Sequence, residues 1–241
     1  MGIIKAQAKN ERGIFKKMSK VQIFGDSILQ GVIFSDEANR YKIRKDKFAT
    51  LAENGIEVEN HSRMGATVKN ILVSQERFIT AENEADVVLL EIGGNDCDFN
   101  WKEVSDNPDG EHTPNTSPDE FVSLYSEAIE RAQKGGKTVA IASLVPIDAE
   151  KYLNWISRGL SKENILRWLG DVSMLSRWHE YYNHLVESLA AKFGCKLIDL
   201  RDEFLCRHDY KTLICTDGIH PTQAGYDVIE KILAREICAA V

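Results

Sequence analysis

Four short polar clusters in the sequence contain residue types that could perform nucleophilic chemistry. The clusters are Gly25-Asp26-Ser27, residues 61–67, Gly93-Gly94-Asn95-Asp96 and residues 217–222. A serine hydroxyl becomes an effective nucleophile when a histidine accepts its proton and a carboxylate orients that histidine, and an asparagine amide can stabilise developing negative charge. Each cluster alone also fits ordinary loop chemistry, because Asp and Ser cap helices and Gly-Asn-Asp forms turns. Together they indicate a reaction centre, provided that the fold brings them to one place.

The first three clusters each follow a segment that is predicted to be a β-strand. Strands are expected, in chain order, over residues 21–24, 56–59, 86–92, 138–144 and 196–200. Residues 87–90 are continuously apolar, which is typical of a strand buried on both faces of a parallel sheet. Helices are predicted over residues 40–52, 67–78, 118–134, 202–208 and 222–239. Residues 95–118 are expected to form a polar loop, and residues 147–193 to be mostly helical, with an insertion at about 147–175.

This alternation of strands and helices predicts one α/β domain over residues 20–241. The expected architecture is a three-layer α/β/α sandwich around a five-stranded parallel sheet of order 2-1-3-4-5, numbered along the chain, as in flavodoxin-like folds. Ligands of such sheets bind outside the carboxyl ends of the strands, and the polar clusters fall at those ends.

Composition narrows the class of protein. The chain has 30 Lys and Arg residues against 37 Asp and Glu, a net charge of −7 that weighs against general nucleic-acid binding. Basic residues are concentrated at residues 1–19, which are predicted to be a solvated basic arm. No apolar run reaches the roughly 18 residues that a membrane span needs. The 5 cysteines include no CxxC pair and favour reduced thiols in the cytoplasm.

The four clusters, in this order and on these elements, resemble the sequence blocks of the SGNH (GDSL-type) hydrolase family. The resemblance extends from Val21 to about Ile232. It implies the flavodoxin-like SGNH hydrolase fold and a serine esterase that works through an acyl-enzyme.

The same resemblance assigns roles to individual residues. It implies that Ser27 is the nucleophile, that His220 is the general base and that Asp217 holds the imidazole. The backbone N–H groups of Ser27 and Gly65 and the side-chain amide of Asn95 would form the oxyanion hole. No cofactor and no metal are expected, because the remaining histidines considered show no metal-ligand spacing: His61, His179, His184 and His208.

The substrate is less well defined by the sequence. Asp26 and Asp96 are interpreted first as braces of their loops, and with Trp101 and Trp155 they are also the candidate substrate-binding residues. Aromatic side chains could stack on sugar rings or line an acyl channel, although Trp155 equally fits helix packing. Because no extended set of apolar loop residues is evident, we expect a short-acyl ester, such as an acetyl ester, of a carbohydrate or small polar alcohol.

Three alternative functions stay open at this point. One is a lysophospholipase or acyl-thioesterase, and a second is an acyltransferase that uses the same triad. The third is a binding protein without catalysis. The only partner expected is the small-molecule ester.

Overall fold

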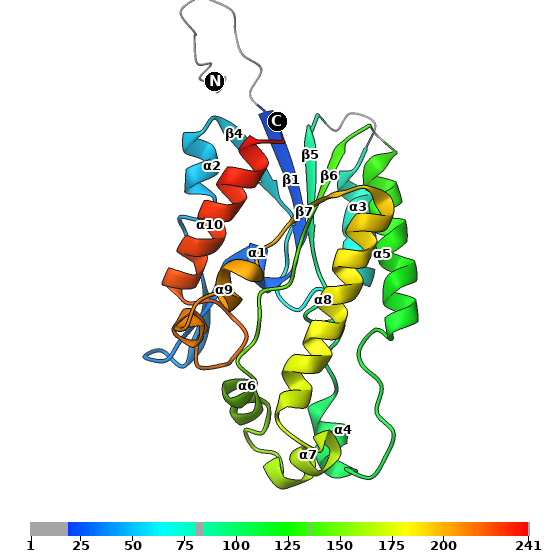
Figure 1. Cartoon of the computed structure of the whole chain (residues 1–241), viewed down its shortest axis with the longest axis vertical. Coiled ribbons are helices and arrows are strands. Elements are labelled where there is room, and N and C mark those ends of the chain that lie inside the picture. Colours follow the sequence, from blue (N-terminus) through cyan, green and yellow to red (C-terminus); the bar gives the residue numbers. More distant parts are fainter. Residues whose placement is uncertain (1–18, 81–83, 135, 241) are drawn as a thin grey trace, which may run out of the picture.

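The computed structural model describes residues 19–80, 84–134 and 136–240. Five parallel strands form one sheet in the order β4-β1-β5-β6-β7 (Figure 1). The strands are β1 (Ser19–Gly25), β4 (Ile56–Asn60), β5 (Val87–Glu91), β6 (Thr138–Ala142) and β7 (Lys196–Ile198). This order is the predicted 2-1-3-4-5, and the predicted fold class is confirmed. The predicted basic arm lies outside the described residues, apart from Ser19 at the start of β1.

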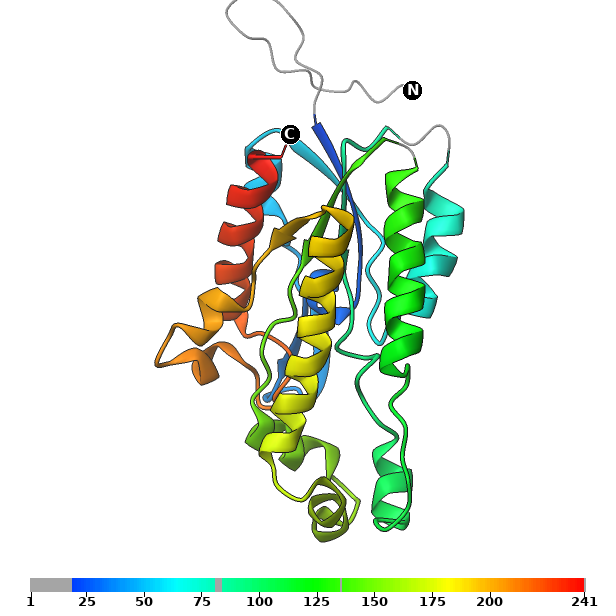
Figure 2. The same ribbon diagram turned by 45° about the vertical axis from the view of Figure 1, so that its right-hand side comes forward.

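Alternate residues of the central strands face two separate cores. In β5, Val87 and Leu89 pack into one core and Val88 and Leu90 into the other, and all four are fully buried. The first core is covered by α1 (Ser27–Gln30), α2 (Ala49–Glu53), α9 (Asp202–Leu205), a 3₁₀ helix (Tyr210–Leu213) and α10 (Gln223–Cys238). The second core is covered by α3 (Val68–Phe78), α5 (Pro118–Gln133) and α8 (Ser173–Phe193). Figures 1 and 2 show these two helical layers on opposite sides of the sheet.

Three of the long helices begin and end where their sequence signals predict. The predicted helices over residues 67–78, 118–134 and 222–239 match α3, α5 and α10 to within one residue at each end. Ser117 caps α5 by accepting the backbone N–H of Glu120, and Thr222 caps α10 by accepting that of Gly225. In the part of the chain that the structure describes, no helix combines the length and the apolar character needed to cross a bilayer.

The helix predicted over residues 40–52 is wrong in its first half. Here β2 (Val32–Ser35) and β3 (Arg40–Ile43) pair as an antiparallel hairpin, and α2 begins only at Ala49. The β-branched and aromatic residues of both segments favour strands. Asn39 turns the chain between them with a φ of 44°, a conformation that Asn tolerates.

Three further helices gather beyond the carboxyl ends of the strands. α4 (Trp101–Asp106) lies inside the segment expected to be a polar loop, and α6 (Ala149–Ile156) and α7 (Lys162–Leu169) lie inside the predicted insertion. They share a third apolar cluster, with Val104 and Ile165 fully buried in it. In Figures 1 and 2 this group lies at the end of the molecule opposite the start of β1 and the end of α10. It therefore stands next to the edge of the sheet where the polar clusters are expected.

Candidate active site

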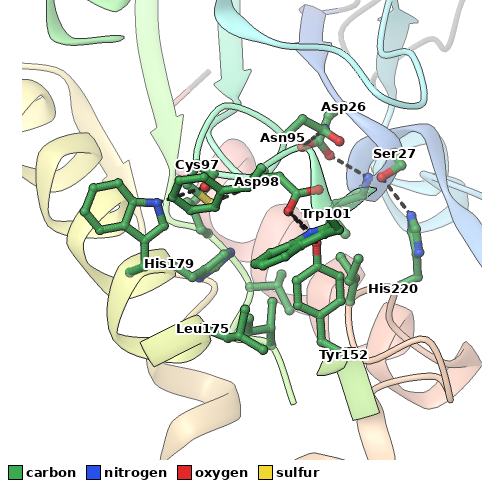
Figure 3. Close-up of a pocket in the computed structure, with 18 of the residues that line it drawn as sticks. Asp26, Ser27, Asn95, Cys97, Asp98, Trp101, Tyr152, Leu175, His179 and His220 are labelled. Carbon is green, nitrogen blue, oxygen red and sulfur yellow. Dashed lines mark hydrogen bonds between the residues drawn. The ribbon is translucent and has the colours of Figure 1, made fainter. Parts of the chain in front are cut away.

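Ser27, His220 and Asp217 form a continuous hydrogen-bonded chain at the carboxyl end of β1. Ser27 is the first residue of α1 and follows the strand after a single residue. The Ser27 hydroxyl donates to His220 Nε2 at 2.9 Å (Figure 3), and His220 Nδ1–H donates to Asp217 Oδ2 at 2.6 Å. Ser27 and His220 are 193 positions apart in the sequence. The structure thus brings together the three residues of the predicted triad.

The Asp217 carboxylate fixes the orientation of the His220 ring. Asp217 is fully buried, and its Oδ1 accepts the backbone N–H groups of Ile219 and His220 at 3.1 Å each. Burial acts to raise the pKa of Asp217, but the hydrogen bond and charge of His220 and the two backbone N–H groups together outweigh it, and the pKa is below its ordinary value. Because Asp217 is ionised and accepts Nδ1–H, the His220 Nε2 lone pair faces the Ser27 hydroxyl. This arrangement activates a hydroxyl for attack on a carbonyl carbon.

Asn95 lies beside Ser27 and is held by two hydrogen bonds. Its Nδ2 donates to Asp26 Oδ2 at 3.1 Å and to the carbonyl of Ala66 at 3.0 Å. Gly65 directly precedes Ala66 and has a φ of 75°, which favours glycine. Ser27 and Asn95 line the main cavity, whereas Gly65 lines a separate exposed hollow. The three segments predicted to form an oxyanion hole are thus joined through Asn95.

Asp26 connects the loop of Ser27 to Asn95 and to a second buried acid, Glu91. Its Oδ1 accepts the Ile28 N–H at 2.9 Å and so caps α1. Burial raises the pKa of Asp26 to about 6. Burial, together with the neighbouring Asp26, raises the pKa of Glu91 well above its ordinary value. At neutral pH we therefore assign the proton of this pair to Glu91 and the charge to Asp26.

Asp96 braces the neighbouring loop rather than facing a cavity. Both of its carboxylate oxygens accept the N–H of Val68, at 3.1 and 3.2 Å, at the start of α3. The side chain is fully buried, and burial raises its pKa to about 6. The candidate role of Asp96 in substrate binding is corrected by this position, because the residue does not line the main cavity. The bracing interpretation fits its contacts.

Known proteins share this arrangement of elements. Residues 23–228 match the GDSL-like Lipase/Acylhydrolase family. The chain belongs to this family. The resemblance inferred from the four polar clusters is confirmed, and the family is one of ester hydrolases.

Solved structures of a lipase/acylhydrolase and of an esterase show the same fold at low sequence identity. A lipase/acylhydrolase from Enterococcus faecalis has a TM-score of 0.62 at 18% identity, over 92% of this chain and 96% of that one. An acetyl xylan esterase from Geobacillus stearothermophilus, in a mutant form, has a TM-score of 0.62 at 19% identity, over 91% of this chain and 94% of that one. No curated protein sequence matches this chain significantly.

The GDSL-type triad opens into a largely apolar cavity of about 90 Å³. Its apolar walls come from the loops after β5 and β6, from α4, α7 and the start of α8, and from the loop of His220: Phe99, Trp101, Leu144, Val145, Ile147, Trp168, Leu169, Met174, Leu175, Trp178 and Ile219. The expectation from the sequence rests on apolar residues in loops, whereas most of this apolar surface comes from helices. This surface is not evident in the sequence because the residues that form it come from five separate segments, most of them helical.

One wall of the GDSL-type cavity carries a small polar network around Trp101. Asp98 Oδ1 accepts the Tyr152 hydroxyl at 2.6 Å and the Trp101 Nε1–H at 2.8 Å (Figure 3). Burial raises the pKa of Asp98. Trp101 lines the cavity as a substrate-contacting residue would, and its indole is held in place by Asp98.

Trp155 does not line this cavity, which corrects its candidate role in substrate binding. Its ring packs against Phe34 and Tyr41, with centroids 4.5 and 6.0 Å away, and the Arg158 guanidinium lies 3.7 Å from its centroid. The packing interpretation fits these contacts.

Sequence reasoning missed Tyr41, which lies next to the triad. Its ring centroid is 5.1 Å from that of His220, and burial together with the Asp217 carboxylate raises the pKa of its phenol. Tyr41 comes from the β2–β3 hairpin, part of which the sequence predicts to be helical. The signal that could have found it is the pair of short β-favouring runs separated by the turn at residues 36–39.

Within the described ranges, no group of three or more His, Cys, Asp or Glu side chains is arranged to hold a metal ion. His61 instead stacks on Phe78 with centroids 3.7 Å apart and lies 3.1 Å from Glu59.

Proposed function

We propose that this chain hydrolyses a carboxylic ester through an acyl-enzyme on Ser27. The observation that carries the proposal is the chain of hydrogen bonds from the Ser27 hydroxyl through His220 to Asp217. Ser27 Oγ attacks the ester carbonyl carbon while its proton moves to His220 Nε2. The tetrahedral intermediate then expels the alcohol, which takes that proton. Water attacks the acyl-enzyme with His220 again as base, releasing the acid and restoring Ser27.

The negative charge of the intermediate needs hydrogen-bond donors beside Ser27. We assign this role to the backbone N–H groups of Ser27 and Gly65 and to the Asn95 amide. Among the described residues, neither backbone N–H has a protein acceptor. The Asn95 amide donates to Ala66 in the free enzyme, so the oxyanion would take over that N–H. A single such donor typically contributes about 10²–10³ in rate.

The position of His220 decides which part of the ester enters the apolar cavity. The leaving oxygen must face His220 Nε2 to receive its proton. From Ser27 the cavity extends past Cys97 and Leu175 to His179, which lies on the opposite side from His220 in Figure 3. The group in the cavity is therefore the acyl group, and the alcohol leaves on the side of His220.

The extended apolar lining of this cavity favours an acyl chain longer than acetyl. Burying apolar surface contributes roughly 25 cal/mol per Å², and an acetyl group would leave most of the walls without contact. The acetyl preference expected from the sequence is thus the second candidate. It is supported by the fold that the chain shares with an acetyl xylan esterase, a likeness of fold alone.

A chain-length series tests both candidates. We expect kcat/KM for p-nitrophenyl esters to rise from acetyl through butyryl to hexanoyl or octanoyl, with Ser27→Ala inactive throughout but melting at the wild-type temperature. A maximum at acetyl would favour the carbohydrate esterase instead. Adding a polar acceptor alcohol to the same reactions distinguishes an acyltransferase, which would form a new ester at the expense of free acid.

The cytoplasm is the proposed compartment, and the cysteines support it. All 5 cysteines are free, and Cys97 and Cys215 are buried. Fractionation of the source cells with an antibody against the chain tests this, since recovery outside the cytoplasm would contradict it.

A further inference from the structure

His179 is a polar side chain buried in the wall of the apolar cavity. It belongs to α8, lines the cavity with Met174, Leu175 and Trp178, and is only 6% exposed. Figure 3 shows its ring across the cavity from Ser27 and His220. A polar group in such a position is costly unless it has a hydrogen-bond partner.

The neighbouring Arg201 determines which nitrogen of His179 carries the proton. Arg201 Nη1 lies 3.4 Å from His179 Nδ1, and a guanidinium can only donate. Nδ1 is therefore the acceptor, and the neutral ring carries its proton on Nε2. Burial, together with Arg201, lowers the pKa of His179 to about 3, so the ring is neutral at physiological pH.

The His179 Nε2–H group has no acceptor among the described residues. Nε2 is also not one of the fully inaccessible side-chain atoms that lack a hydrogen-bond partner. Since the residue lines the cavity, this N–H is open to the cavity. Arg201 fixes the orientation of the His179 ring, because the Arg201 guanidinium is itself held by the Leu144 carbonyl at 3.1 Å and by Glu180. The cavity thus ends in one positioned hydrogen-bond donor.

We propose that the far end of the cavity recognises an acyl group that carries an uncharged acceptor oxygen, bound by His179 Nε2–H. The proposal rests on the function proposed above, since it specifies the acid part of the same ester. The oxygen is that of a ketone or a hydroxyl rather than a carboxylate. The acidic side chains of Asp26 and Asp98 line the same cavity, none of the described residues that line it is a lysine or arginine, and the nearby Arg201 is already paired with Glu180, so a carboxylate on the acyl group would have no free cation to meet.

Pairs of substrates that differ only in this oxygen test the proposal. The probes are p-nitrophenyl esters of (ω−1)-oxo hexanoic, heptanoic and octanoic acids, each compared with its (ω−1)-methyl isostere. For every pair the ratio of kcat/KM values, oxo over methyl, is divided by the ratio of the hydroxide-catalysed rates. At one chain length we expect wild type to favour the oxo ester by about tenfold, the effect of one well-placed hydrogen bond.

Variants on one helix separate recognition from folding. In His179→Leu the oxo preference is expected to disappear while the methyl esters are still hydrolysed, and His179→Gln, which keeps an N–H donor, retains part of it. His184 is an exposed histidine of the same helix, so His184→Leu serves as the matched control and is expected to behave as wild type.

Two outcomes overturn the proposal. One is that the oxo-over-methyl ratio of kcat/KM, after division by the ratio of hydroxide-catalysed rates, equals one in wild type at all three chain lengths. This result is decisive even if a variant fails to fold. The other is an oxo preference that His179→Leu leaves unchanged. Both outcomes can be told apart from a failure of the proposed function, because in that case the wild type hydrolyses neither the oxo nor the methyl esters.

Discussion

The Asn95 amide donates to the Asp26 carboxylate at 3.1 Å, while the other oxygen of that carboxylate caps the helix that begins at Ser27. One buried side chain therefore positions both the proposed nucleophile and a proposed oxyanion donor. This relationship explains why the residue before Ser27 is an acid. Asp26 positions the reacting groups but does not contact the reacting atoms in the proposed mechanism.

Replacing Asp26 is expected to disturb both groups at once. Asp26→Ala should lower kcat by about 10²-fold, the effect of losing one oxyanion donor, because Asn95 loses its anchor. Steady-state kinetics paired with thermal melts measure it, and Asp119→Ala, an exposed acid in the first turn of α5, is the control. A folded Asp26→Ala enzyme with wild-type kcat would show that Asn95 needs no anchor.

Glu91 is expected to act as a neutral acid beneath this carboxylate. Because burial and Asp26 raise its pKa, glutamine should replace it well, and Glu91→Gln is expected to keep kcat within about threefold of wild type. Glu91→Ala removes the partner of a buried charge and should cost about 1–3 kcal/mol of unfolding free energy. Denaturant unfolding and kcat distinguish the two variants. Equal damage by both would mean that Glu91 is ionised in the folded protein.

Asp96 should make the stability of the fold depend on pH. Its folded pKa of about 6 exceeds the ordinary 3.8, so its contribution is complete below about pH 4 and is lost as the pH rises through 6. A difference of this size between the folded and unfolded pKa corresponds to roughly 2 to 3 kcal/mol. The unfolding free energy of wild type minus that of Asp96→Asn should therefore fall between pH 4 and 7. If this free-energy difference stays constant over the range, the pKa of Asp96 is not raised.

Tyr41 is expected to shield the triad from water. Tyr41→Ala should lower kcat/KM by about tenfold, since it uncovers the buried Asp217–His220 hydrogen bond, whereas Tyr41→Phe keeps the ring and should have a small effect. Ile43→Ala, an exposed position on the same strand, is the control. Wild-type kinetics in a folded Tyr41→Ala variant would show that Tyr41 does not shield the triad.

The features that sequence predicts well are local. Strand β5 is apolar throughout its centre, the caps Ser117 and Thr222 mark the starts of α5 and α10, and the residues that form the hydrogen-bonded triad lie in short recognisable blocks. The sheet order follows from the alternation of these elements.

The features that sequence misses depend on packing between distant segments. The four residues of β3 also fit a helix, because they gain strand geometry only by pairing with β2. The apolar cavity escapes prediction because Trp168 and Leu175 show ordinary core spacing in their own helices, and they meet Leu144 only in the folded chain. The tautomer of His179 depends on Arg201, a contact that no local pattern encodes.

The central claim is that Ser27 is the nucleophile. A fluorophosphonate ester reacts covalently with an activated serine, and mass spectrometry of the digested protein locates the adduct. We predict one adduct, on the peptide containing Ser27, in wild type at neutral pH. None is expected in Ser27→Ala, and a strongly slowed reaction is expected in His220→Ala. A folded wild-type protein that stays unlabelled, or that is labelled at another residue, would contradict the account.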